Sequence, residues 1–338
     1  MEATLREVEA QVRAANTRGD AAAEGDARVR VAGVLTAMGR LADAIAELEK
    51  AGPLFVKAGQ PAEHAGATWA LALLVTRDPK RKGEARDLLL KVRALATLGG
   101  RPDLEAKALF RLAMVEADAQ DLDAALAWLA TLLEKAPDVR TRIEAHRARA
   151  GFFQALGRPN RALSELEAAL SLARDAGDAR TALQLRLEKR VLQPFTADLG
   201  TWESFAVLLE DARAAGDPVL EGAIELQRAG VALRGDRPEE GEQAAQAARA
   251  AALASGDVVL YTLACMLIAE ARELAGDRSG VLAILLTCKA TLEQRFGKEA
   301  GRPVVWVLQA TEARWGKEAT DAALAEYRRM AASRMPQA

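Results

Sequence analysis

The stretch ALSELEAALSLARDAGD, residues 162–178, decides the fold of this chain. Its apolar side chains recur at helical spacing, as in Ala162, Leu166 and Ala169, and this pattern predicts an amphipathic helix with one buried face. The helix is predicted to end at Gly177, because glycine readily takes the left-handed conformation that terminates helices. The stretch therefore contains the second helix of a structural unit and the turn that closes the unit.

The same closing turn recurs along the chain. It is found at Ala58-Gly59-Gln60, Leu98-Gly99-Gly100, Ala136-Pro137-Asp138, Ala176-Gly177-Asp178, Ala215-Gly216-Asp217 and Ser255-Gly256-Asp257. Adjacent central residues of this series lie 40, 38, 40, 39 and 40 positions apart. A fixed period of this length is typical of stacked supersecondary units, so the sequence predicts an α-solenoid.

A second turn falls inside each unit, so each unit is predicted to hold two helices. These inner turns are expected at Gly39, Asp78-Pro79, Gln120-Asp121, Gly157, Gly200, Gly235, Gly276 and Gly316. We expect about eight antiparallel helix pairs, preceded by a half-unit helix at 1–20 and closed by a capping helix and tail at 317–338. The whole chain, 1–338, is predicted to be one continuous helical-repeat domain.

One segment departs from the period. Pro194 interrupts the fifth unit, between Gln193 and Gly200, because proline cannot continue a helix. Two readings remain open for this segment: a longer connection between two helices, or a hinge or loop that reaches into a groove.

The repeat pattern resembles the tetratricopeptide repeat family. In the third unit, motif positions 4, 7, 8, 20, 24, 27 and 32 are taken by Leu109, Leu112, Ala113, Ala125, Leu129, Leu132 and Pro137. Alanine at positions 8 and 20 allows close approach of paired helices, and the larger residues fill the space around that contact. The units are longer than the usual repeat of about 34 residues. The resemblance implies a right-handed superhelix and a binding fold, without naming a ligand.

Composition supports an all-α chain and excludes several classes of protein. Half of the 338 residues are apolar, only 4% are aromatic, and the formal net charge is −2. Helix formers dominate, and no overall basic field exists to hold nucleic acid. The sequence shows neither a signal peptide at its start nor an apolar stretch long enough for membrane insertion. We expect a soluble, cytoplasmic protein, and the alanine- and arginine-rich composition is typical of a GC-rich bacterial genome.

Residues that could support catalysis are scarce. Neither of the two histidines, His64 and His146, has a partner at metal-ligand spacing. Cys265 and Cys288 are expected to be buried, inert thiols. Phosphate-binding loops, nucleophile elbows and dinucleotide fingerprints are absent from the sequence. We therefore expect no enzyme activity, no metal and no cofactor.

Charge is distributed unevenly along the chain. Residues 139–190 carry eleven Lys and Arg against six Asp and Glu, whereas residues 201–257 carry five against eleven. The family resemblance implies that the first helix of each unit lines a concave surface through motif positions 2, 5, 9 and 12. On that basis the expected partner-binding residues are Trp69, Phe110, Arg147, Arg186, Arg190 and Gln193. The resulting groove would have an apolar stretch, a basic middle and an acidic far end; the alternative is a merely solvated surface.

This pattern favours a protein-interaction scaffold or adaptor. The expected partner is another protein or peptide, with an acidic stretch that arginines could bind through bidentate contacts. An alternative is a regulatory receptor whose superhelix responds to a small peptide or metabolite. RNA binding by related helical repeats would require a broadly basic surface, and the acidic residues of 201–257 argue against it.

Four aromatic residues gather near the C-terminal end. They are Phe296, Trp306, Trp315 and Tyr327. We expect them to fill the core beneath the capping helix, and the alternative is a patch for a partner or a second copy of the chain.

Overall fold

A computed structural model of the chain describes residues 1–77, 81–193 and 200–333. Within these ranges the backbone forms seventeen α-helices and a short 3-10 helix, η2, and no β-strand. The prediction of an all-α chain is confirmed. The segment around Pro194, the turn expected at Asp78-Pro79 and the tail at 334–338 lie outside the described residues.

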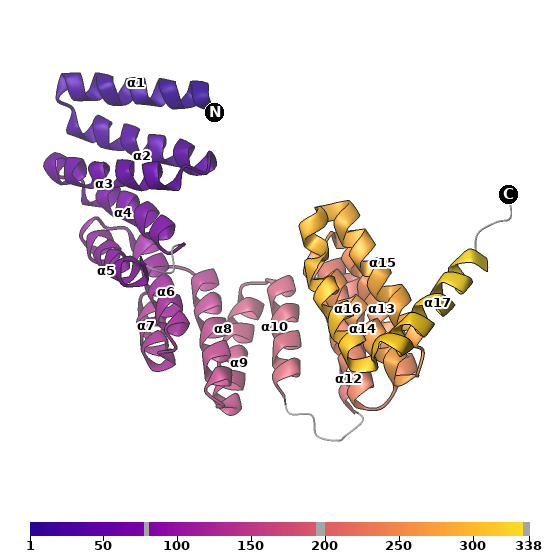
Figure 1. Cartoon of the computed structure of the whole chain (residues 1–338). Helices are drawn as coiled ribbons and strands as arrows, with labels where there is room; N and C mark the ends of the chain where they lie inside the picture. The colour runs from indigo at the N-terminus through magenta and orange to yellow at the C-terminus, as the bar shows by residue number, and fades with distance from the viewer. Residues whose placement is uncertain (78–80, 194–199, 334–338) are drawn as a thin grey trace. The chain divides into compact units, whose positions relative to one another are not determined.

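The chain divides into two compact units, Met1–Ala179 and Arg180–Ala338, and each is considered by itself (Figure 1). Unit 1 contains α1 (Glu2–Arg18), α2 (Ala21–Ala37), α3 (Leu41–Ala58), α4 (Pro61–Val75), α5 (Lys82–Leu98), α6 (Pro102–Asp118), α7 (Leu122–Lys135), α8 (Val139–Ala155) and α9 (Pro159–Asp175). Unit 2 follows with α10 (Ala179–Leu192), α11 (Gly200–Ala214), α12 (Pro218–Arg234), α13 (Pro238–Ser255), α14 (Val258–Leu274), α15 (Arg278–Phe296), η2 (Lys298–Gly301), α16 (Arg302–Trp315) and α17 (Lys317–Ser333).

Consecutive helices pack side by side from α1 to α9 in unit 1 and from α11 to α17 in unit 2, as a helical repeat requires (Figure 1). After α1, the described helices follow one another as the predicted eight pairs, from α2/α3 to α16/α17. First helices of neighbouring pairs also touch: α6 contacts α4 and α8 in unit 1, and α12 contacts α14 in unit 2. In unit 1 the first helices α4, α6 and α8 therefore share one face, which carries the candidate site.

The residues that match the repeat motif form the core. In the pair α6/α7, the motif residues have exposed fractions of 0% at Leu109, Leu112, Ala113, Ala125, Leu129 and Leu132. The stripe on α9 that includes Ala162, Leu166 and Ala169 is likewise buried. Alanine at the closest contacts lets the helices approach, and the leucines around it remove apolar area from water.

The turns follow the sequence pattern except at two of the predicted inner turns. One was expected at Gly200, which is instead the first residue of α11. Gly177 closes its unit at a φ of 69°, as expected for a left-handed terminating residue. The inner turn of the sixth pair was predicted at Gly235, but that residue has a φ of −88°. Its neighbour Asp236 takes the left-handed conformation instead, at a φ of 56°, and Gln120 does the same at 66°. Short polar and amide side chains therefore replace glycine at some of these turns.

The prediction for the C-terminal aromatic residues is only partly confirmed. Trp315 packs against the buried cluster of α14 and α15, and its Nε1 donates a 2.8 Å hydrogen bond to Glu273. Trp306 is 72% exposed and Phe296 is 45% exposed, so these two do not fill the core. The α16 face that meets the core is carried by Val304 instead, which is fully buried.

Candidate functional site

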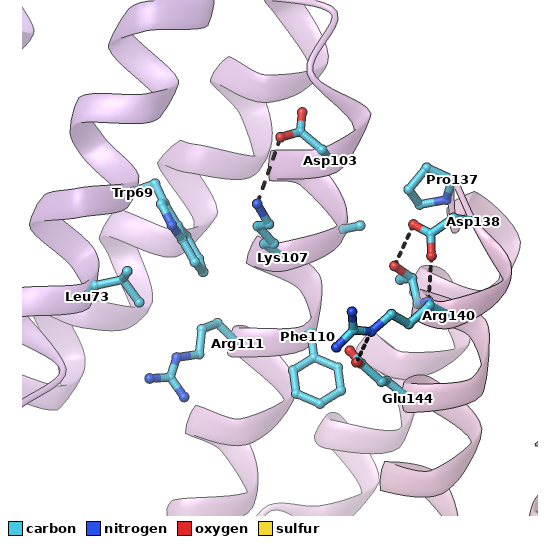
Figure 2. Close-up of a pocket in the computed structure, with 12 residues that line it drawn as sticks. Trp69, Leu73, Asp103, Lys107, Phe110, Arg111, Pro137, Asp138, Arg140 and Glu144 are labelled. Atoms are coloured by element: carbon cyan, nitrogen blue, oxygen red, sulfur yellow. Dashed lines mark hydrogen bonds and ion pairs between the residues drawn. The ribbon is translucent and has the colours of Figure 1, made fainter. Parts of the chain in front are cut away.

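The aromatic residues expected at motif position 5 of the second and third pairs line one pocket. Trp69 on α4 and Phe110 on α6 both reach a cavity of about 530 Å³, which α8 closes on its other side (Figure 2). Both side chains are half-buried. Successive first helices lie against one another in this unit, so side chains at the same motif position project into the same space.

Both rings pack against buried side chains of the core. Trp69 packs against two buried clusters that include Leu104 and Leu112. Phe110 packs against the α6/α7 core around Leu129. Two aromatic side chains that are held by the core on one side and exposed on the other lose little conformational entropy when they bind a ligand.

Three aliphatic residues complete the apolar lining of the pocket. Leu73 lies one helical turn beyond Trp69 on α4, Ala106 lies one turn before Phe110 on α6, and Pro137 lies at the turn into α8. This concave, largely apolar surface with a few polar groups at its rim has the character of a ligand pocket.

The carboxylates on the rim are already engaged by the protein. Asp103 accepts hydrogen bonds from Arg101 at 2.9 and 3.0 Å, and that guanidinium lowers the pKa of Asp103. Glu144 accepts one from Nε of Arg140 at 3.3 Å (Figure 2). These carboxylates are therefore balanced by cations within the fold.

Asp138 acts as the N-cap of α8. Its carboxylate accepts 2.8 Å hydrogen bonds from the backbone N–H and from Oγ1 of Thr141 (Figure 2). The backbone hydrogen bond is the main cause that lowers the pKa of Asp138, because it stabilises the charged form. The same cap satisfies the first turn of the helix that closes the pocket.

The cations of the pocket are less fully engaged. Lys107 lies 4.0 Å from Asp103, which already holds Arg101. The Arg111 guanidinium is exposed, and among the described residues it has no hydrogen-bond or ion-pair partner (Figure 2). An anionic group of a ligand would therefore find Arg111 available in this pocket.

A second cavity of about 390 Å³ adjoins the first along α6. It shares Leu73 and Arg111 with the first pocket and continues to Met114, Val115 and Asp118 of the same helix. The two cavities therefore form one row beside α6, with Arg111 at their common border.

Sequence reasoning predicted two of the lining residues and missed others. Leu73, Lys107 and Arg111 were not among the candidates, although they carry much of the surface and charge of the site. Leu73 and Lys107 occupy motif positions 9 and 2, which the family resemblance places on the concave face. The full set of concave positions, and not position 5 alone, therefore predicts Leu73 and Lys107, whereas Arg111 at position 6 lies outside that set.

The remaining predicted residues do not join this pocket. Arg147 on α8 is half-buried and is not part of its lining. In unit 2, Arg186 donates a 2.6 Å hydrogen bond to Asp211, and Arg190 lies over the Phe205 ring at 5.5 Å. Gln193 continues α10 through a backbone hydrogen bond to Lys189.

These contacts change the interpretation of the charge blocks. The basic residue Arg180 pairs with Asp217 at 2.5 Å, and Arg186 pairs with Asp211, both across the sequence boundary between the two blocks. Part of the basic block is thus neutralised by the acidic block within the fold, and the groove with a basic middle stays a prediction.

The cysteines and histidines have structural surroundings. Cys265 and Cys288 are buried, at 0% and 1% exposure, as predicted. A hydrogen bond to Cys265 and burial raise the pKa of Cys288, so its thiol keeps its proton. His64 is buried between helices, and burial together with the charge of Lys91 lowers its pKa. His146 contacts Glu165 at 2.7 Å.

The described residues hold neither a metal-binding cluster nor a membrane-spanning helix. No group of three or more His, Cys, Asp or Glu side chains suited to a metal ion occurs among them. None of the helices in the described ranges combines the length and apolar composition that a membrane crossing requires.

Comparison with known proteins identifies the fold. No protein-family model matches the sequence, and no curated protein is significantly similar to it. Among solved structures, the apo form of RapI matches with a TM-score of 0.58 at 11% identity, over 92% of this chain and 87% of RapI. Aspartyl phosphate phosphatase F from Bacillus subtilis matches with a TM-score of 0.52 at 10% identity, over 90% and 92%.

A third matched structure is described as containing tetratricopeptide repeats. It is a signal transduction ATPase with numerous domains (STAND) from Pyrococcus horikoshii, which has a tetratricopeptide repeat sensor. The TM-score is 0.53 at 14% identity, over 90% of this chain, and the chain spans about half, 52%, of that protein. The expected helical-repeat solenoid of tetratricopeptide type is confirmed as a fold.

Proposed function

We propose that this chain is a protein-interaction module that binds a peptide segment of a partner protein in the pocket between α4, α6 and α8. The observation that carries the proposal is the convergence of Trp69 and Phe110 on one cavity of about 530 Å³. Tryptophan and large aromatic side chains dominate binding energy when they lie in a defined pocket, and neighbouring contacts mainly exclude water.

The lining favours binding over bond-breaking chemistry. Its apolar floor offers contact area, and its carboxylates are held by Arg101, Arg140 and the cap of α8. The hydroxyl of Thr141 is committed to Asp138 as well. Polar groups engaged in this way hold the helices in place, and the Arg111 guanidinium remains to orient a ligand. The matched structures of RapI and of aspartyl phosphate phosphatase F support the repeat fold on which this proposal depends.

The remaining sequence-based candidates are proposed for a separate surface of each unit. Arg147 would add to the binding surface of unit 1, on α8, and Arg186, Arg190 and Gln193 would form a surface of unit 2. An acidic stretch in the partner would suit these arginines. Charge reversal of Arg147, Arg186 and Arg190 tests this part: unchanged affinity for the captured partner would remove these residues from the binding surface.

A regulatory receptor for a small peptide or metabolite is the second candidate. The cavity volume of about 530 Å³ falls within the range of roughly 300–1,000 Å³ typical of small-ligand sites. A receptor of this kind would change its radius of gyration in solution scattering when the ligand binds, whereas a scaffold would keep it.

Affinity capture from a lysate of the source cells tests the proposal, with the full chain as wild type, Trp69→Ala and Trp306→Ala. Trp306 is the matched control, because it is an exposed indole in unit 2 outside the pocket. We expect a protein that wild type and Trp306→Ala retain and Trp69→Ala loses, with all three chains equally helical by circular dichroism. Equal capture by Trp69→Ala would move the binding site away from this pocket.

A further inference from the structure

The two cavities beside α6 define a pattern that a ligand must match. The first touches α6 from Asp103 to Arg111 and the second from Arg111 to Asp118. Their midpoints fall near Lys107 and Val115. An α-helix rises about 1.5 Å per residue, so these midpoints lie roughly 12 Å apart along the helix axis.

An extended peptide covers the same distance in four residues. Its rise of about 3.3 Å per residue places residues i and i+4 roughly 13 Å apart. Residues i, i+2 and i+4 of an extended chain lie on one face, so two apolar side chains at i and i+4 would enter the two cavities together. The side chain at i+2 then lies opposite the common border.

Arg111 occupies that border. It lines both cavities, its guanidinium is exposed, and it has no partner among the residues that the structure describes. The carboxylates of the first cavity are held elsewhere, by Arg101, Arg140 and the cap of α8. In the lining of the second cavity, the carboxylate of Asp118 is offset by a further cation, Arg77. The charge complementary to this position is therefore negative, and a carboxylate matches the fork of a guanidinium.

We propose that the partner segment is an extended stretch with apolar residues at i and i+4 and an Asp or Glu at i+2, laid along α6 with its carboxylate on Arg111. This inference rests on the proposed function and specifies its ligand. Trp69 and Phe110 hold the first apolar side chain, and Leu73, Met114 and Val115 hold the second. The pattern is the same when it is read from either end, so both directions of the peptide chain satisfy it. The two directions differ in which apolar residue enters which cavity.

Synthetic peptides and the full-length chain test the pattern. The probes are fluorescein-labelled, end-capped heptapeptides of the form Gly-X-Ser-Asp-Ser-X-Gly, with Phe, Leu or Met at each X, so that both directions are sampled. Two companion sets carry Asn in place of Asp, or have the second X moved to i+3. Fluorescence anisotropy gives the dissociation constant of each peptide for wild type, Arg111→Gln, Lys107→Gln and Trp69→Ala.

We expect at least one Asp peptide to bind wild type about ten-fold more tightly than its Asn counterpart, as a charge-assisted hydrogen bond would give. Arg111→Gln should abolish that ratio. Lys107→Gln is the matched control, since it removes a cation of the first cavity away from the border, and it should preserve the ratio. Trp69→Ala should weaken the Asp and Asn peptides alike, and the i+3 set should bind more weakly than the i+4 set.

Three results would overturn the inference: no binding by any Asp peptide, an Asp-to-Asn ratio that survives Arg111→Gln, or a ratio that depends on Lys107 instead. Failure of the proposed function has a different signature. Lysate capture that depends on Trp69, combined with no preference for the pattern, rejects the pattern and keeps the pocket. Capture that is indifferent to Trp69 rejects both.

Discussion

Trp69 of α4 and Phe110 of α6 occupy the same motif position in successive helix pairs and line one cavity. Trp69 rests on buried leucines of its own pair and of the next, Leu89 and Leu112. Phe110 rests on the core around Leu129. The exposed sides of the two rings form one surface as a result of the repeat, because the first helix of each pair lies beside the first helix of the preceding pair.

This relationship predicts energetic coupling in binding. Trp69→Ala and Phe110→Ala should each weaken binding of the captured partner by about 2 kcal/mol, as is common for central aromatic residues. The double variant should lose less than the sum, because the two rings share one ligand group. A double-mutant cycle by isothermal titration measures the difference. Strict additivity would show that the rings contact separate parts of the partner.

Two glycines of α2 should respond oppositely to the same substitution. A Cβ at Gly25 would lie 2.8 Å from the ring of Phe55, which is 1% exposed and cannot move aside. Gly25→Ala should therefore destabilise the fold by roughly 1–3 kcal/mol. A Cβ at Gly33 meets nothing within 4 Å, so Gly33→Ala should stabilise the helix by about 0.5–1 kcal/mol. Thermal unfolding of the two variants should give shifts of opposite sign, and shifts of the same sign would contradict the packing of α2 on α3.

The core of the α6/α7 pair should be sensitive to cavity formation. Leu129 is 0% exposed, and Leu129→Ala should cost about 2–5 kcal/mol through lost burial and the void left behind. Leu98, 73% exposed at the end of α5, is the matched control, and Leu98→Ala should change stability by less than about 0.5 kcal/mol. Amide hydrogen exchange in α6 and α7 reports this local stability. Equal protection in the two variants would place Leu129 outside the core.

Acid should weaken the contact between α8 and α9. Burial alone would raise the pKa of Glu165, but the hydrogen bond from His146 and the charge of Arg149 outweigh it and lower the pKa below its ordinary value of 4.5. Because the folded pKa is the lower one, the stabilisation is complete above about pH 4.5 and is lost as the pH falls through the folded pKa.

Glu165→Gln checks the sign of this effect. The variant should be less stable than wild type at pH 6 and should lose less stability below pH 4.5, because it has no carboxylate to protonate at this position. Melting temperatures measured from pH 6 to pH 3 give both slopes. Parallel slopes would show that Glu165 contributes no pH dependence to the fold.

Much of the fold could be predicted from the sequence because it depends on spacing within a single helix pair. The buried stripes around Leu112 and Leu166 and the turn at Gly177 are local features, and the structure confirms them. The choice of Asp236 over Gly235 for the left-handed residue was not predictable in the same way, because both residues tolerate that conformation and the exact end of the helix selects one.

The candidate site was predictable only in part. Motif position 5 identified Trp69 and Phe110, but nothing in the spacing alone indicated that Arg111 borders two cavities. Net charge along the sequence was also a poor guide to the surface. Arg186 pairs with Asp211, from the block of opposite sign, because an ion pair depends on the nearest carboxylate in space and not on the sum along the chain.

The sequence by itself determined that this chain is a stack of long helical hairpins with a small-residue contact inside each pair, since helix periodicity and turn chemistry act over a few residues. Only the tertiary structure decided that Trp69, Phe110 and Arg111 border connected cavities and that Trp306 is exposed. Those outcomes depend on how successive pairs pack on one another. This packing sets the distances between side chains of different pairs, which the spacing within one pair does not determine.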